Sequence, residues 1–330
     1  MTFSFRSTAV ALTAAVSLTA LAACSSPAAT PSGTTTPAEA SSGQAAPLVV
    51  AVAFYPFQFV AERVGGNLVT VENLTAPGAE PHDLELAPQQ VALLSTADLV
   101  VIQHGFQPAV DTALEQATPK HLVDTASFLQ LHPAAAGDEE EDADHEEGED
   151  SHDHDHGALD PHTWLDPTNV ASIAEHVRDA LIEERPDAAD TLKANTQKLL
   201  DDLSTLDGEF TSGLATCKVK TFVTSHAAFG YLAERYGLEQ VAIRGVEPDV
   251  EPSAARIAEV QQIAKEQGIT TIFFETLVSP VVSESIAGDL GLKTDVLDPL
   301  EGITAESRGT DYLEVMRSNL ASLRTANQCA

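Results

Sequence analysis

From residue 48 onwards the chain alternates short β-rich runs with amphipathic stretches, and this alternation restricts the fold more than any other feature. Runs such as LVVAVAF (48–54) and ADLVVIQ (97–103) are rich in Val, Ile and Leu and have the length of buried strands. Between them, PFQFVAERVG and PQQVALLST repeat apolar residues at helical spacing. Strand–helix–strand repetition is typical of a parallel sheet with helices on both faces. The pattern therefore predicts an α/β fold.

The alternation occurs twice, which predicts two lobes of similar design. We expect the strands at residues 48–54, 68–74, 97–103 and 121–125, and then at 219–225, 238–243, 270–275 and 293–298. Residues 169–215, between the two series, contain no strand signal and are predicted to be linking helices. The N-terminal lobe is then expected at 48–168 and the C-terminal lobe at 216–330.

The linking segment ends in a long helix, because apolar residues recur at helical spacing at Leu192, Leu199, Leu200, Leu203 and Leu206. A single long helix between two α/β lobes would connect them stiffly. The alternative is that its apolar face binds a partner protein. We predict the rigid bridge.

The N-terminus predicts export. Arg6 precedes an apolar run over residues 9–23, which is too short to span a membrane and is typical of a signal peptide over residues 1–23. The run ends in LAAC, which resembles the lipobox of bacterial lipoproteins and implies lipidation of Cys24. Residues 24–47 are Ser, Thr, Pro, Ala and Gly with few bulky side chains, and we expect a flexible tether. The protein is therefore expected outside the cytoplasm, anchored to the cell membrane by lipid.

A strongly acidic segment interrupts the first half. The chain has a net charge of −33, which argues against nucleic acid as a partner. Residues 138–155 alone contain twelve Asp and Glu, and we expect a disordered loop over 138–157. Its histidines are expected to collect metal only weakly, because ordering such a loop costs entropy. They are His145, His152, His154 and His156.

Two cysteines, Cys217 and Cys329, lie in the exported part of the chain. Exported proteins meet an oxidising compartment, so we expect a disulfide that ties the C-terminus to the start of the second half. The alternative is two free thiols.

The residues that can bind metal stand near the ends of predicted strands. In open parallel sheets, ligands bind at the carboxyl ends of the strands. His82 follows the second strand of the first half, His226 follows the first strand of the second half, and Asp298 ends the last strand. His162 stands just ahead of the linking helices. Three imidazoles and one carboxylate form a tetrahedral set that suits Zn²⁺.

Each of these residues also has an ordinary structural alternative. His82 would serve as a turn residue, His226 as a capping or core histidine, and Asp298 as the start of an Asx turn before proline. His162 would belong to the mobile acidic loop that precedes it. Their shared position at strand ends favours the metal site. The remaining histidines are expected to be structural, although His104 also stands at the end of a predicted strand. They are His104, His121, His132 and His176.

Six motifs resemble, in the same order, the zinc-binding solute-binding proteins of ABC-type metal importers. They are PGAEPHDLELAPQQVALLSTADLVV, DPHTWLDP, TFVTSHAAFGYLAERYGL, EPSAARIAEV, TIFFETLVSP and TDVLDPL. The resemblance extends from about Leu48 to the C-terminus. It implies two α/β lobes bridged by a rigid helix, with the metal held between them by His82, His162, His226 and Asp298.

The resemblance also implies the function. We expect capture of Zn²⁺ and its delivery to an ABC permease with a cytoplasmic ATPase, by a monomer that catalyses no reaction. Some zinc members have glutamate directly before the first histidine, whereas this chain has Pro81 there and Glu80 one residue earlier. Manganese members are similar but typically replace the third histidine with a carboxylate, so His226 favours zinc over a manganese-binding alternative.

Two alternatives come from other classes of protein. A zinc hydrolase would have three protein ligands and a water in the fourth position, with Glu275 at a strand end as general base. The chain lacks an HExxH motif, and a ligand at Asp298 would fill the fourth position. The other alternative is a surface adhesin, which nothing beyond the predicted exposure supports.

Overall fold

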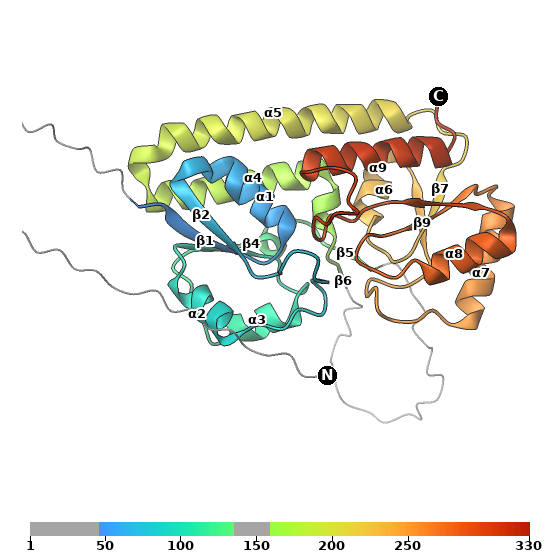
Figure 1. Ribbon diagram of the computed structural model, residues 1–330. Coiled ribbons are helices and arrows are strands. Elements are labelled where there is room, and N and C mark those ends of the chain that lie inside the picture. The colour runs from blue at the N-terminus through green and yellow to red at the C-terminus, as the bar shows by residue number, and fades with distance from the viewer. Residues whose placement is uncertain (1–45, 135–158) are drawn as a thin grey trace, which may run out of the picture. The chain divides into compact units, whose positions relative to one another are not determined.

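The computed structural model describes residues 46–134 and 159–330, which fold around two parallel four-stranded sheets (Figure 1). The first sheet has the order β2-β1-β3-β4 and the second the order β10-β9-β7-β8. Their strands are β1 (Leu48–Val52), β2 (Val69–Asn73), β3 (Leu99–Ile102), β4 (Leu122–Asp124), β7 (Thr221–Thr224), β8 (Glu239–Ala242), β9 (Thr271–Phe274) and β10 (Lys293–Val296). A short antiparallel pair, β5 (His132–Pro133) and β6 (Leu159–Asp160), flanks the acidic segment in sequence.

Helices follow the strands. They are α1 (Tyr55–Gly65), α2 (Pro88–Thr96), α3 (Pro108–Leu114), α4 (Pro167–Glu184), α5 (Ala189–Leu214), α6 (Gly230–Tyr236), α7 (Ala254–Glu266), α8 (Val281–Leu290) and α9 (Tyr312–Ala326). Of these, α1 and α2 lie at PFQFVAERVG and PQQVALLST, where the apolar periodicity predicts helices. Proline stands at the first helical position of α2, α3 and α4, where its missing N–H leaves no hydrogen bond unmade. Single 3₁₀ turns add η1 (Gly66–Leu68), η2 (Thr125–Ser127), η3 (Thr163–Leu165) and η4 (Pro186–Ala188).

The long helix α5 has 26 residues and crosses from one sheet to the other in Figure 1. Its leucine face is buried, as Leu192, Leu199, Leu203 and Leu206 are each at most 1% exposed. This face packs on α4 and α1 of the first half and on α9 and α6 of the second. The predicted two-lobed α/β fold with a long bridging helix is confirmed. The apolar face of α5 is covered by the chain itself, so the partner-binding alternative for it is wrong.

One hydrophobic core runs through both lobes. It begins at the strands of the first sheet, continues along the bridging helices and includes Phe222 of β7 and Phe273 of β9 in the second. A second, smaller cluster around Val223, Val260 and Ile272 fills the other face of the second sheet under α7 and α8. Residues Ala45–Ala330 accordingly form one compact unit. The shared core fixes where the carboxyl ends of the two sheets lie.

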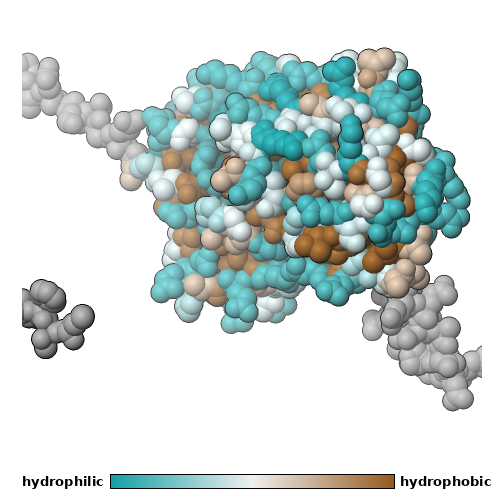
Figure 2. Space-filling model, turned by 45° about the vertical axis from the view of Figure 1, so that its right-hand side comes forward, coloured by the Kyte–Doolittle hydropathy of each residue, from teal (hydrophilic) through white to brown (hydrophobic). Residues whose placement is uncertain are grey.

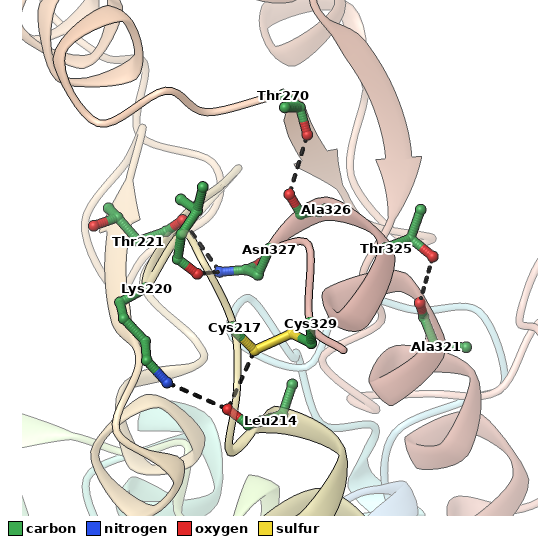
Figure 3. The surroundings of a disulfide bond; sticks show 11 residues. Leu214, Cys217, Lys220, Thr221, Thr270, Ala321, Thr325, Ala326, Asn327 and Cys329 are labelled. Carbon is green, nitrogen blue, oxygen red and sulfur yellow. Dashed lines mark hydrogen bonds between the residues drawn. A yellow bond between two sulfur atoms is a disulfide. The ribbon is translucent and has the colours of Figure 1, made fainter.

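The predicted disulfide between Cys217 and Cys329 is confirmed (Figure 3). Hydrogen bonds add to the covalent link, because Asn327 Nδ2 donates to Val219 O at 3.0 Å and Val219 N donates to Asn327 O at 3.2 Å. Thr270 Oγ1 donates to Ala326 O at 3.1 Å. The C-terminus is therefore joined to the second lobe both covalently and by hydrogen bonds.

Several sequence predictions concern residues outside the described ranges. They are the signal peptide, Cys24, most of the tether, and the loop over 138–157 with His145, His152, His154 and His156. Among the described residues, no helix combines the length and the apolar content needed to cross a membrane. The face shown in Figure 2 is mostly hydrophilic with smaller apolar patches.

Candidate metal centre

The three predicted histidines come together from both lobes. His82 lies between β2 and α2, and His162 lies between β6 and η3, both in the first half of the chain. His226 stands two residues beyond β7 in the second half. The side chains of His82, His162 and His226 are 2%, 0% and 0% exposed. Their ring centroids are 5.1–5.8 Å apart.

The carboxylate that completes this group belongs to Glu301. Its Oε1 lies 3.4 Å from Nε2 of each of the three imidazoles, and Nε2 of His162 lies 3.2 Å from Nε2 of His226. All four candidate ligand atoms lie within 4.8 Å of one another. Zinc–nitrogen and zinc–oxygen bonds of about 2.0–2.1 Å place tetrahedral ligand atoms about 3.3–3.4 Å apart. The three carboxylate–imidazole distances and the His162–His226 distance therefore match a single tetrahedral ion, and the remaining ligand atoms are at most 4.8 Å apart.

Asp298, which we predicted as the fourth ligand, does not belong to this group. Its Oδ1 accepts a hydrogen bond from Leu300 N at 2.8 Å, and its Oδ2 accepts one from Ser307 Oγ at 2.8 Å. Leu300 has a positive φ of 62°, so the chain turns sharply after Pro299. This turn directs Glu301 rather than Asp298 at the histidines. The Asp298 side chain stabilises the turn as an Asx turn, by accepting the hydrogen bond from Leu300 N.

Sequence reasoning missed Glu301 because it took the first carboxylate beyond the strand. The available signal was a second carboxylate in the motif DPLE, three residues after Asp298 and still within the same turn. Only one of the two can point into the site, and strand position does not decide between them. The backbone conformation at Leu300 does.

Each histidine has a carboxylate at its other ring nitrogen. Asp160 Oδ1 lies 2.8 Å from Nδ1 of His162, and Glu275 Oε2 lies 2.7 Å from Nδ1 of His226. Glu247 Oε2 lies 3.5 Å from Nδ1 of His82. A carboxylate at Nδ1 favours the tautomer that leaves Nε2 free to bind metal, and it fixes the plane of the ring.

Two of these orienting carboxylates, Asp160 and Glu247, were not predicted. Asp160 stands two residues before His162 in DPH, which is a detectable signal, because its Oδ1 also accepts the His162 backbone N–H at 2.9 Å. Glu247 is remote in sequence from His82 and has no such signal. Glu275, which we considered as a general base, instead accepts hydrogen bonds from Ser225 Oγ and from His226 N at 3.2 Å.

Neighbouring carboxylates raise the pKa of two of the metal-free histidines, His82 and His226. Burial lowers the pKa of His82, but hydrogen bonds to Glu247 and Glu301 outweigh it and bring the pKa to about 9. Burial likewise lowers the pKa of His226, and Glu275 and Glu301 raise it well above its usual value. Burial raises the pKa of Glu301, while hydrogen bonds to His162 and His226 bring it well below its usual range. Without metal, the site therefore retains protons that a bound cation would displace.

Glu80, whose role as a ligand the sequence left open, lies next to the group without joining it. Its Oε1 accepts the backbone N–H of His82 at 3.2 Å. Burial and the charge of Glu301 raise the pKa of Glu80 to about 7. The four atoms grouped as candidate ligands come from His82, His162, His226 and Glu301.

The histidines that we expected to be structural have other partners. The side chain of His104 is 67% exposed and its Nδ1 lies 3.0 Å from Asp111. His121 Nε2 lies 2.6 Å from Glu184, and the ring of His176 stacks on Phe128 with centroids 3.7 Å apart. None of these three histidines is part of the grouped ligands in the described ranges.

Comparison with known proteins identifies the family. Residues 50–326 match the family model described as "Zinc-uptake complex component A periplasmic", ZnuA. The chain belongs to the ZnuA family. The sequence is 38% identical over 283 residues to the zinc-binding lipoprotein AdcA of Streptococcus pneumoniae, which covers 84% of this chain and 55% of AdcA. It is 35% identical over 283 residues to the high-affinity zinc uptake system protein ZnuA of Bacillus subtilis, covering 84% and 86% of the two chains.

Solved structures agree with the ZnuA-family fold. The crystal structure of the Zn(II)-bound ZnuA-like domain of Streptococcus pneumoniae AdcA matches with a TM-score of 0.70 and 35% identity. The match covers 85% of this chain and 99% of that domain. The chain thus spans about half the length of the whole AdcA proteins but nearly all of their ZnuA-like domain.

Proposed function

We propose that this ZnuA-family protein captures Zn²⁺ outside the cytoplasm and delivers it to an ABC permease powered by a cytoplasmic ATPase. The observation that carries the proposal is the convergence of three imidazole Nε2 atoms on Oε1 of Glu301, at 3.4 Å each. Nitrogen-rich, borderline-soft tetrahedral sites suit zinc, whereas manganese prefers mostly oxygen ligands. The names of the relatives, zinc-binding lipoprotein and zinc uptake protein, support the same cargo.

The donor set also supports transport rather than catalysis. A catalytic zinc site keeps one position open for water, whereas four protein donors occupy every position of a tetrahedral ion. Glu275, the candidate base of the hydrolase alternative, is committed to Ser225 and His226. The proposed protein therefore holds its ion without activating a water molecule.

The chain's N-terminus supports a place at the membrane surface. LAAC at residues 21–24 would make Cys24 a lipidated anchor, and the tether would give the metal-binding lobes reach. In this proposal the protein acts as a monomer, and its partners are the permease and, through it, the ATPase. Residues 138–157 are proposed to gather zinc only weakly.

Calorimetric titration with zinc tests the proposed ligands. The protein is expected to show one tight site whose affinity falls by more than about 100-fold, the upper range for second-shell substitutions, in His226→Ala and in Glu301→Gln. His104→Ala is the matched control, because this histidine is exposed and lies outside the ligand group. Full-affinity binding by both ligand variants would refute the proposed centre.

Deletion of residues 138–157 separates the loop from the tight site. The tight site is expected to remain, and any weaker sites are expected to disappear with the loop, since its histidines would have to order a chain dominated by like charges. Loss of the tight site on deletion would show that the loop supplies an essential ligand.

A further inference from the structure

His162 is oriented by a residue that the opposite lobe holds in place. Asp160 contacts Nδ1 of His162 and accepts its backbone N–H, both through Oδ1. The backbone O of Asp160 in turn accepts a hydrogen bond from Tyr231 Oη of α6, at 2.8 Å. Tyr231 Oη also accepts the N–H of His132, in the strand that pairs with β6, at 3.0 Å. One hydroxyl of the second lobe thus joins both strands of this pair.

Gly230 leaves the space that the Asp160 carboxylate occupies. A Cβ at residue 230 would stand 2.6 Å from Asp160 Oδ2, closer than nonbonded atoms approach. Asp160 is 5% exposed, so its carboxylate is surrounded by protein on its other sides. The first residue of α6 therefore fits against the carboxylate that orients His162.

We propose that Gly230 and Tyr231 are positioning residues for zinc, acting through Asp160 on His162. The inference rests on the proposed function, in which His162 is a zinc ligand. His162, a ligand from the N-terminal lobe, keeps its orientation only while α6 of the C-terminal lobe contacts β6, which contains Asp160. Movement of α6 away from β6 would free Asp160 and let the His162 ring turn, so parting of the lobes would weaken His162 as a ligand.

Gly230→Ala tests the steric step. The added methyl group displaces the Asp160 carboxylate, and zinc affinity is expected to fall about 10- to 100-fold, as for other groups that orient a metal-bound histidine. In an Asp160→Ala background the methyl group has no carboxylate to displace, so Gly230→Ala should cause no further loss. Such non-additivity reports coupling between the two residues, which general damage to the fold would not produce.

Tyr231→Phe tests the hydrogen-bonding step, with Tyr236→Phe as the matched control. Tyr236 lies on the same helix and also donates its hydroxyl, but to Asp207 at 2.9 Å. With Co²⁺ in place of Zn²⁺, Tyr231→Phe is expected to shift the visible absorption bands, which follow the coordination geometry, and to weaken binding. Tyr236→Phe should leave both the bands and the affinity unchanged.

The outcomes separate this inference from the proposed function. If His162→Ala binds zinc as tightly as the unmodified protein, the proposed ligand set fails. If His162→Ala loses the tight site while Gly230→Ala and Tyr231→Phe keep full affinity and unchanged cobalt spectra, the positioning role fails and the zinc site stands. An equal loss from Gly230→Ala with and without the Asp160 carboxylate would also overturn the positioning role.

Discussion

At the scale of single residues, the two nitrogens of each imidazole have different partners, and this difference governs metal binding at the site. Nε2 of all three histidines faces one oxygen of Glu301, while Nδ1 faces a carboxylate outside the ligand group. The Nδ1 carboxylates make the imidazoles better ligands, because they stabilise positive charge on the ring. The same carboxylates make protons stronger competitors for the empty site.

Without metal, the protein is expected to lose stability between about pH 6.5 and pH 9. The pKa of His82 is about 9 when folded and near its ordinary 6.5 when unfolded, so its contribution is complete below pH 6.5 and disappears as the pH rises through 9. Below pH 6.5, His82 contributes roughly 3 kcal/mol to the free energy of unfolding. The raised pKa of His226 acts in the same direction. Urea denaturation in chelator at pH 6 and pH 9 measures the difference.

His82→Gln is the control for this pH dependence. The substitution removes the proton but keeps a polar side chain of similar reach, so it should flatten the stability profile between the two pH values. A metal-free protein that becomes more stable from pH 6 to pH 9 would contradict the assignment.

At the scale of the elements, the segment between β10 and α9 carries Glu301 and is fixed at several points. Asn319 of α9 accepts Asp298 N at 3.0 Å and donates to Asp298 O at 2.7 Å. Trp164 Nε1 donates to Pro299 O at 2.7 Å, across from the first half of the chain. Helix α9 therefore holds the turn that supplies the carboxylate, and its other end is held by the disulfide.

Removing the disulfide should lower stability without lowering zinc affinity. The bond closes a separation of 112 residues, and a closed loop of about that length is worth about 4.7 kcal/mol in the chain-entropy model, within a usual range of about 2–5. We expect a loss in that range for the double variant Cys217→Ser/Cys329→Ser, measured by urea denaturation. Neither cysteine belongs to the ligand group, so titration should show unchanged binding. A large fall in affinity would show that the C-terminal link also shapes the site.

For the molecule as a whole, one ion would connect two lobes that already share a core. His82 and His162 come from the first half of the chain, and His226 and Glu301 from the second. Helix α5 packs on both halves, so the lobes are held close before metal arrives. A ligand that binds only the folded state stabilises both lobes together.

Zinc is therefore expected to raise the unfolding temperature of both lobes in one transition. Bound zinc should raise the free energy of unfolding by about 4 kcal/mol when the free zinc concentration exceeds the dissociation constant about 1,000-fold. Scanning calorimetry with zinc and with chelator measures it, and Glu301→Gln should lose most of the increment. Two separate transitions, of which zinc moves only one, would show that the ion is held by a single lobe.

The sequence by itself determined the alternating α/β elements and the two lobes with their long bridging helix, and it favoured the pairing of Cys217 with Cys329 over two free thiols. The first two features follow from the apolar periodicity of short segments. The disulfide was expected because exported cysteines meet an oxidising compartment. The sequence also indicated His82 and His226, because the ends of parallel strands lie at one edge of a sheet whatever the loop details. His162 was indicated by its place just ahead of the linking helices.

Only the tertiary structure decided which carboxylate completes the centre. Asp298 and Glu301 are both acidic and belong to one turn, and the left-handed backbone at Leu300 directs the second of them inward. Glu247, which contacts His82, and Tyr231, which donates to Asp160, come from the lobe opposite to the residue they contact. Contacts between segments so distant in the chain depend on how the lobes pack, and no local pattern of residues encodes them.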